Sequence, residues 1–596
     1  MIQERLNKLR KSMKAAGIDC YLIPTSDYHD SEYVSSFFMV RKYFSGFTGS
    51  AGTLVVTEKE AALFTDGRYF IQAEKELAGS EIRLMKMGEP GVPTVKEYVE
   101  SSLAEGQTLG FDGRVVGADK AEIYEEILAK KKGRLIWDRD LAEEIWEDRP
   151  KLVHHPVSFL EERYSGESTA SKLKRLREKM KEEGAECHLL TSLDDIAWLL
   201  NIRGRDIDYC PVVFAYAAVT MEQVHLFAGD KEIFGAEVVR RLEENSVMLH
   251  PYDSFYEYVS GIHDKKVLLC QARVSCRVMK ELPEDVTVID SPNPTTLMKA
   301  VKNSVEMENL RKAHLKDGIA VTKFMYWLKQ NIGKLPMTEV SAAQYLEQLR
   351  RQQEDFMGPS FETICAYGAN GAIIHYSAEP ESCAQLEPRG LVMVDSGGHY
   401  PEGSTDITRT FALGPVSEEE KRHFTLVLRA MLNLKCSRFL YGCRGINLDI
   451  RAREILWEQG LDYKHGTGHG VGYLLNVHEG PNSFRWKLMP DYQDNAVLEE
   501  GMVTSDEPGI YIEGSHGIRI ENELLCRKGE QNEYGQFMYF EDLTYVPIDL
   551  DGVEFSLLEE KDRQRLNAYH KQVCEMLEPY LEGEELAWLR KVTGAV

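Results

Sequence analysis

Residues 390–413 read GLVMVDSGGHYPEGSTDITRTFAL, and this stretch decides how the region around it folds. The apolar run 391–394 predicts a strand that ends on Asp395. A glycine pair then permits a turn, and from Asp406 onward polar and apolar residues alternate as in a half-buried strand. Carboxylates on two paired strands can converge on one point. A single Asp at a turn more often caps that turn, so the stretch needs support from elsewhere in the chain.

A glycine-rich loop follows at residues 465–481, HGTGHGVGYLLNVHEGP. It holds three histidines, His465, His469 and His478, together with five glycines. Glycine at this density lets the backbone approach a ligand closely. Histidine is the commonest transition-metal ligand and a natural proton carrier. A lone histidine is usually structural, whereas three in one glycine-rich loop favour a functional site.

Two acidic segments come next. In EEGMVTSDEPGIYI (499–512) a short strand ends at Glu507, where a Pro-Gly turn places the carboxylate at the edge of a site. A loop acid in an acidic protein is a serious competing interpretation. In HGIRIENELL (516–525) strand alternation puts Arg519, Glu521 and Glu523 on one face. Arg519 either forms a salt bridge there or orients a metal-binding carboxylate.

A further histidine, His375, follows an apolar stretch in GANGAIIHYSAEP (368–380). Taken alone, it fits a hydrogen-bonded core histidine as well as a catalytic one.

Together these segments offer four carboxylates, one imidazole and no thiolate. The five residues are Asp395, Asp406, His469, Glu507 and Glu521. Oxygen-rich sets suit hard divalent ions such as Mn²⁺ better than structural zinc. Four acids in one place repel one another and raise one another's pKa unless a counter-charge is present. Two divalent cations supply that charge, and at a separation of about 3.5–4 Å they can share a bridging water and lower its pKa.

The bulk composition is that of a globular protein with several domains, with 596 residues of which 43% are hydrophobic and 28% charged. The net charge of −25 argues against a nucleic-acid binder and against docking on an anionic membrane. The amphipathic N-terminus lacks the apolar core of a secretory signal, and the eleven cysteines form no Cys-x-x-Cys pair. We therefore expect free thiols and a cytoplasmic protein with no nucleic-acid or membrane partner.

An internal repeat organises the first half of the chain. Each copy predicts an amphipathic helix that ends at a glycine and is followed by strands. The matched positions include Leu6, Leu9, Met13 and Gly17 in the first copy and Leu173, Leu176, Met180 and Gly184 in the second. The strand signals are TLVVT (53–57) and AALFTDGRYF (61–70) in the first copy, and VVFAYAAV (212–219) and VHLFAGD (224–230) in the second.

Breaker-rich segments at 146–163 and 291–296 divide the chain, and a helix is predicted to begin at Ser304 with Glu306 in its first turn. The fold class is α/β (α+β). The predicted domains are 1–158 and 159–298 for the two copies, 299–548 for the region that carries the candidate site, and 549–596 for a helical extension. No chemistry is predicted in that extension, which is interpreted as a packing appendage.

At the candidate site the chain resembles the pita-bread metallopeptidases, a family that includes methionine aminopeptidase, prolidase, aminopeptidase P and the metal-free creatinase. The resemblance rests first on the order of the Asp, Asp, His, Glu and Glu residues named above. The strings HGTGHGVG and NVHEGP and the Arg-x-Glu pairing look like the Xaa-Pro branch, and GFTGSAGTLVVT and FTDGRYFIQA are similar to the cytosolic three-domain aminopeptidase P subfamily. The resemblance implies two related creatinase-N-like α/β domains, a pita-bread catalytic domain and a helical C-terminal extension.

The resemblance also implies a reaction. The expected protein is a metal-dependent aminopeptidase that releases the first residue from peptides with proline in second place, by attack of a water that bridges two cations. Asp406 and Glu521 would bridge the cations, Asp395 would complete one of them, and His469 with Glu507 would complete the other. Manganese is the expected metal, with zinc or cobalt as alternatives, and a homodimer is the expected assembly.

Further roles follow from the same resemblance. Glu507 would shuttle a proton, and His478 would stabilise the developing oxyanion. His375 would contact the substrate near the scissile bond, His465 would line the site on the proline side, and Arg519 would orient a ligand. Proline has no N–H and a fixed ring, so it needs a shaped apolar slot rather than a donor contact.

Three alternatives compete with this interpretation. Prolidase cleaves only Xaa-Pro dipeptides, and chain length and the duplicated first half favour aminopeptidase P over it. A non-catalytic scaffold homologue is disfavoured because no ligand is missing. Creatinase-type hydrolysis without metal is disfavoured because such an enzyme has no use for the complete ligand set.

Overall fold

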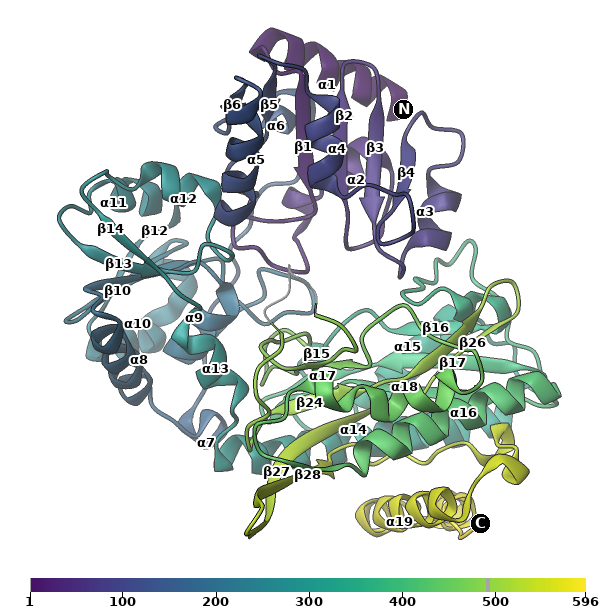
Figure 1. Cartoon of the computed structure of the whole chain (residues 1–596). Coiled ribbons are helices and arrows are strands. Elements are labelled where there is room, and N and C mark those ends of the chain that lie inside the picture. The colour runs from purple at the N-terminus through teal and green to yellow at the C-terminus, as the bar shows by residue number, and fades with distance from the viewer. Residues whose placement is uncertain (1, 489–493) are drawn as a thin grey trace. The chain divides into compact units, whose positions relative to one another are not determined.

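The computed structural model describes residues 2–488 and 494–596 (Figure 1). The chain forms two compact units. One comprises the residues up to Glu161 together with Glu167–Thr295, and the other comprises Glu162–Gly166 and Thr296–Val596. Within the described residues, no helix is both long enough and apolar enough to cross a membrane.

The first sheet of the N-terminal unit follows the amphipathic helix α1 (Ile2–Ala16), which buries Leu6, Leu9 and Met13. Gly17 ends the helix with a φ of +69°, a conformation that glycine adopts without steric cost. The sheet order is β4 (Arg83–Lys86), β3 (Ala61–Thr65), β2 (Thr53–Thr57), β1 (Cys20–Pro24), β5 (Thr108–Gly110) and β6 (Arg134–Ile136). The β1–β2 and β2–β3 pairs are antiparallel, and the others are parallel.

The second sheet repeats this plan after helix α8 (Thr169–Glu183), which ends at Gly184 in the left-handed conformation. Its order is β12 (Val247–Pro251), β11 (Val224–Ala228), β10 (Tyr216–Thr220), β8 (Cys187–Leu190), β13 (Lys266–Leu269) and β14 (Thr287–Asp290). The β8–β10 and β10–β11 pairs are antiparallel and the others are parallel, as in the first sheet. The shared order and directions confirm the predicted repeat of related α/β folds, while the domain boundaries at 158, 298 and 548 stay predictions.

This unit also contains further, shorter helices. In the first half they are α2 (Val40–Ser45), α3 (Phe70–Glu76), α4 (Val95–Ser102), α5 (Ala118–Lys130) and α6 (Leu141–Ile145). In the second half they are α9 (Leu193–Leu200), α10 (Gly235–Glu244), α11 (Phe255–Ser260) and α12 (Cys276–Glu281).

Two strand predictions in this unit extend too far. Strand β3 stops at Thr65, and the end of the AALFTDGRYF segment already belongs to helix α3. Strand β10 begins only at Tyr216, although residues 212–215 are buried. Short apolar runs do not distinguish a strand from other buried backbone, which explains both errors.

The C-terminal unit begins with the long helix α14 (Ser304–Asn331), as predicted. The Asn303 side chain accepts hydrogen bonds from the backbone N–H groups of Val305 and Glu306, and the Glu306 carboxylate accepts from the Asn303 N–H. This capping box satisfies N–H groups that the helix itself leaves unpaired. The other main helices are α15 (Glu339–Arg350), α16 (Glu418–Lys435) and α18 (Ile450–Trp457).

Several small sheets form the centre of this unit. Strand β17 (Leu391–Ser396) lies between β16 (Ile364–Tyr367) and β20 (Ile407–Ala412), and all three pair antiparallel. A second sheet has the order β21 (Arg438–Leu440), β28 (Gly535–Asp542), β27 (Asn522–Asn532) and β24 (Val503–Asp506). Two further pairs are β25 (Gly509–Ile512) with β26 (His516–Arg519), and β22 (Gly468–His469) with β23 (Ser483–Phe484).

Strand β20 is more buried than its sequence predicts. Every residue from Ile407 to Ala412 is buried, whereas the polar and apolar alternation predicts one solvated face. Helices α14 and α15 contribute to one apolar core against β17 and β20, and α16 contributes to a second core. The polar side chains of β20 therefore point into the protein, where they need partners.

The chain ends in two helices, α19 (Glu560–Leu577) and α20 (Gly583–Val592), drawn in yellow in Figure 1. Helix α19 contacts α16 and buries Leu566, Val573 and Leu577 in the same apolar core. The predicted helical extension is thus part of the unit that carries the candidate site and packs against its helix α16.

Candidate metal centre

Two strands deliver the first pair of acidic residues. Asp395 lies near the end of β17, directly opposite Thr408 of β20. Asp406 immediately precedes β20. Because β17 and β20 are antiparallel neighbours, the end of one strand lies beside the start of the other, and the two carboxylates face the same region.

The other three candidate ligands come from later strand ends. His469 is the last residue of β22, and Glu507 directly follows β24. Glu521 lies between the end of β26 and the start of β27, where the backbone is continuous but the strand is interrupted. This break differs from the continuous strand that alternation predicts for residues 516–525. The Glu521 N–H donates to the Thr408 carbonyl at 3.0 Å, which holds the break against β20.

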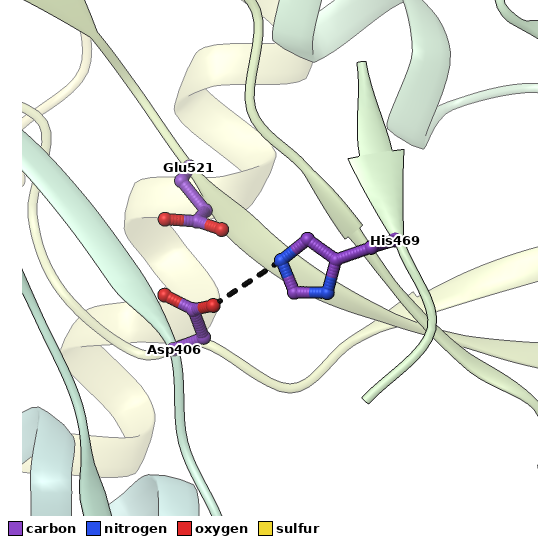
Figure 2. A group of neighbouring side chains, drawn as sticks. All are labelled: Asp406, His469 and Glu521. Atoms are coloured by element: carbon purple, nitrogen blue, oxygen red, sulfur yellow. Dashed lines mark ion pairs between the residues drawn. The ribbon is translucent and has the colours of Figure 1, made fainter. Parts of the chain in front are cut away.

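Three of these side chains point toward one another (Figure 2). Asp406, His469 and Glu521 each offer one ligand atom, and the three atoms lie within 4.8 Å of one another. His469 Nε2 is 3.4 Å from Asp406 Oδ2 and 3.5 Å from Glu507 Oε1. These separations exceed those of good hydrogen bonds, so the groups surround a common point rather than pair directly.

The remaining carboxylate, Asp395, is joined to Arg519. Arg519 Nη2 donates to Asp395 Oδ2 at 2.5 Å, and Arg519 Nη1 donates to the Tyr511 hydroxyl at 2.7 Å. His465 Nε2 lies 2.9 Å from the same hydroxyl. The structure therefore links Asp395 to His465 through Arg519 and Tyr511.

Burial and mutual repulsion dominate the electrostatics. Burial, followed by the negative charges of Asp395 and Glu507, raises the pKa of Asp406 well above its ordinary value. Burial and then the charge of Asp406 do the same to the pKa of Glu521. Burial also raises the pKa of Glu507, while His469 and Arg519 oppose this shift. The site therefore favours added positive charge.

The last histidine of the glycine-rich loop, His478, lies beside His469. His478 packs its ring edge-on against His469, with ring centroids 4.2 Å apart. The neighbouring Glu479 is buried, with Lys302 Nζ at 2.7 Å and Lys299 Nζ at 3.1 Å. These two ion pairs fix the segment that carries His478.

His375 is half-buried in the turn that follows residues Gly368–Ala372. The carbonyl of the preceding residue, Ile374, lies 3.5 Å from Arg519 Nη2. The turn bearing His375 therefore borders the arginine that contacts Asp395.

Several supporting residues were not assigned a role from the sequence. Glu523 Oε1 accepts a hydrogen bond from the Asp406 N–H at 2.6 Å and lies 3.2 Å from His314 Nε2. Thr408 Oγ1 donates to Glu521 Oε2 at 2.7 Å. For Glu523 the sequence offers one indication of such a role, because strand alternation places it on the same face as Glu521. His314 lies on α14, and no local sequence pattern predicts its contact with Glu523.

The donor set fits divalent cations. Ligand atoms of Asp406, His469 and Glu521 converge, the charges of Asp395 and Glu507 act on Asp406, and the Arg519 guanidinium is a nearby positive charge. Asp395 Oδ1 is buried without a hydrogen-bond partner. A buried carboxylate oxygen left in this state is unfavourable unless a cation or an ordered water meets it. Oxygen ligands with one imidazole suit Mn²⁺-type ions.

Models of known families match the chain in the same order as its folded parts. Creatinase/Prolidase N-terminal domain models match residues 5–136 and 148–306. Metallopeptidase family M24 matches residues 308–528, which contain the candidate ligands, and a C-terminal region of peptidase M24 matches residues 536–596. The fold and the site thus define the class as an M24 metallopeptidase with creatinase-type N-terminal domains.

Relatives match over nearly the whole length. Aminopeptidase P2 of Arabidopsis thaliana is 40% identical, with 98% of this chain and 87% of that protein covered. A protein of Laccaria bicolor named "Probable Xaa-Pro aminopeptidase P" is 39% identical, with 99% and 92% covered. The crystal structure of X-prolyl aminopeptidase from Caenorhabditis elegans, described as a cytosolic enzyme with a di-nuclear active site, superposes with a TM-score of 0.95 at 34% identity over 100% of both chains. The chain therefore belongs to the Xaa-Pro aminopeptidase P family of M24 metallopeptidases.

Proposed function

We propose that this protein is an aminopeptidase that releases the N-terminal residue from peptides with proline in second place. The observation that carries the proposal is the convergence of Asp406, His469 and Glu521 within 4.8 Å, in a chain similar along its whole length to Xaa-Pro aminopeptidases. Family membership alone leaves the reaction open, because one fold can host several activities.

Two divalent cations are the cofactors in this proposal. Asp406 and Glu521 would hold both cations, Asp395 would complete one ligand set, and His469 with Glu507 would complete the other. The raised pKa values of Asp406, Glu507 and Glu521 support this assignment, because such a site gains most from added positive charge. When bound, the cations lower the pKa of the attacking water and polarise the scissile carbonyl. The oxygen-rich set makes Mn²⁺ the proposed metal over Zn²⁺ or Co²⁺.

The chain's own groups handle the proton and the substrate. Glu507 takes the proton of the attacking water and passes it to the leaving proline nitrogen, a role suited to a carboxyl whose pKa burial raises. His478, beside His469, donates a hydrogen bond to the oxygen that gains charge. His375 contacts the substrate backbone, and Arg519 holds Asp395 in place.

The proline ring occupies the side of the site near His465. His465 contacts the Tyr511 hydroxyl, which Arg519 also contacts, so its ring is held at a fixed position relative to Asp395. Proline offers no N–H to recognise, and shape therefore selects it.

We also propose that the protein acts in the cytoplasm as a homodimer. Its eleven cysteines are all free thiols, which suits a reducing compartment, and the C. elegans relative is described as cytosolic. The homodimer rests on the family resemblance, and light scattering after size-exclusion chromatography tests it.

The activity is tested with purified, metal-depleted protein given Mn²⁺ and three peptides, Arg-Pro-Pro, Arg-Pro and Arg-Ala-Pro. The proposal predicts release of Arg from Arg-Pro-Pro only, and only with metal. Cleavage of Arg-Pro alone would establish a prolidase instead. A folded sample that cleaves none of the three with any divalent metal would overturn the peptidase proposal.

A further inference from the structure

A buried arginine supports the backbone of Glu521 from behind the site. Arg409 lies on β20, next to Thr408, and is 2% exposed. Its Nη1 donates to the carbonyl of Glu521 at 2.6 Å and to that of Thr408 at 3.0 Å. Its Nη2 donates to Asn522 Oδ1 at 2.8 Å. The guanidinium therefore binds both Glu521 and Asn522, which lie where the strand is interrupted between β26 and β27.

The C-terminal extension reaches the same arginine. Tyr569 of α19 is buried, and its hydroxyl accepts a hydrogen bond from Arg409 Nη2 at 2.7 Å. The hydroxyl also lies 2.8 Å from the Val546 carbonyl, to which it can donate. A single hydroxyl thus connects helix α19 to the guanidinium that holds Glu521.

Arg409 has six acceptors for its five N–H groups, and together these acceptors set where the guanidinium lies. Its hydrogen bonds go to carbonyl, amide and phenol oxygens, and burial lowers its pKa. A buried guanidinium depends on complete hydrogen bonding, because water is not available as a substitute partner. Nη2 shares its two N–H groups among three acceptors, which are the Tyr569 hydroxyl at 2.7 Å, Asn522 Oδ1 at 2.8 Å and the Val546 carbonyl at 3.0 Å. Removal of the Tyr569 hydroxyl would take away the shortest of these contacts and would let the guanidinium shift toward the other two acceptors.

We propose that Tyr569 is a positioning residue for Glu521, and that the C-terminal extension acts through Arg409 to hold this residue where it meets a cation. The inference rests on the proposed function, since only there is Glu521 a metal ligand. Thr408 holds the Glu521 side chain, with its hydroxyl 2.7 Å from Oε2, and Arg409 holds the Glu521 carbonyl. The two contacts together fix the residue at both ends.

The test compares Tyr569→Phe with a matched control. Tyr326 of α14 also binds the C-terminal extension through its hydroxyl, at 3.1 Å from Glu584 Oε2 of α20, and its contact does not involve Arg409. Mn²⁺ binding to the metal-depleted full-length protein is measured by calorimetry. We expect Tyr569→Phe to raise the Kd for Mn²⁺ roughly tenfold, as for other partners that orient ligands. Tyr326→Phe should bind as the unaltered protein does, and peptide cleavage by Tyr569→Phe should recover at saturating Mn²⁺.

A second variant tests the route through Arg409. Arg409→Lys keeps the charge but cannot serve all of the acceptors, so its Kd should rise more than that of Tyr569→Phe. The double variant should bind no worse than Arg409→Lys alone, because Tyr569 acts through the guanidinium. Unchanged Mn²⁺ affinity in folded Tyr569→Phe, or additive effects in the double variant, would overturn the inference and leave the proposed function intact. Absence of metal binding in the unaltered protein would overturn both.

Discussion

Substitution of Glu339 by Gln should loosen the segment that carries His375. Glu339 is the first residue of α15 and is fully buried. Four donors converge on its carboxylate and tie down the chain on both sides of His375. They are the Tyr367 N–H at 2.7 Å and Asn370 Nδ2 at 2.9 Å on Oε1, and the Tyr376 hydroxyl at 2.8 Å and the Ala384 N–H at 2.7 Å on Oε2.

The size of the effect follows from these contacts. Glutamine keeps one acceptor oxygen and presents an NH₂ group to two donors. The Tyr376 hydroxyl can rotate and accept from that NH₂, but the Ala384 N–H is left without a partner. One unsatisfied, partly buried donor and the loss of charge assistance cost about 2 kcal/mol of unfolding free energy. That cost corresponds to a fall in Tm of roughly 4–8 °C for a unit of a few hundred residues.

The assay combines stability with kinetics. Glu339→Gln should lower the Tm by this amount and lower kcat/KM for Arg-Pro-Pro, while the Kd for Mn²⁺ stays unchanged because Glu339 holds the turn and not the ligands. Glu347→Gln is the matched control, because Glu347 lies on the same helix and makes an exposed ion pair with Arg351. A Tm and kcat/KM equal to those of the control would refute the reasoning.

Two further predictions concern buried charge. Arg519→Met removes the partner of Asp395 and should lower the free energy of unfolding of the metal-free protein by about 3–5 kcal/mol, part of which Mn²⁺ restores. Urea unfolding with and without metal measures this, and a metal-free variant as stable as the unaltered protein would contradict it. Burial lowers the pKa of His570 from 6.5 to about 4, so its neutral form stabilises the fold above pH 6.5 and this contribution is lost as the pH falls through 4. The unaltered protein should therefore lose about 3 kcal/mol more than His570→Gln between pH 7.5 and 4, and parallel profiles would argue against it.

The sequence predicts the parts of this protein that depend on local pattern. Amphipathic periodicity and terminal glycines mark the repeated helices α1 and α8, and the equal strand orders of the two sheets confirm the repeat. The order of acidic residues and histidines indicates a pita-bread metallopeptidase, and the similarity to Xaa-Pro aminopeptidases confirms that the chain belongs to this family.

Long-range contacts account for what the sequence does not predict. The strand is interrupted at Glu521 although polar and apolar residues alternate through it, because the Glu521 N–H donates to the carbonyl of Thr408, which lies far away in the chain. Glu339 is indistinguishable in sequence from any acid in the first turn of a helix. Tyr569 lies on a helix whose pattern indicates only packing, and its hydroxyl meets Arg409, 160 positions earlier. Such partners become visible only once the chain is folded.

In the proposed function, Asp406 and its neighbours hold two cations that the reaction requires. The most direct measurement is the metal content of the protein after dialysis against Mn²⁺, taken together with Arg release from Arg-Pro-Pro, for the unaltered protein and Asp406→Asn. We expect two Mn²⁺ per chain and Mn²⁺-dependent release in the unaltered protein, with fewer than two ions and no release in the folded variant. Full activity without metal, or two ions and full activity in Asp406→Asn, would contradict it.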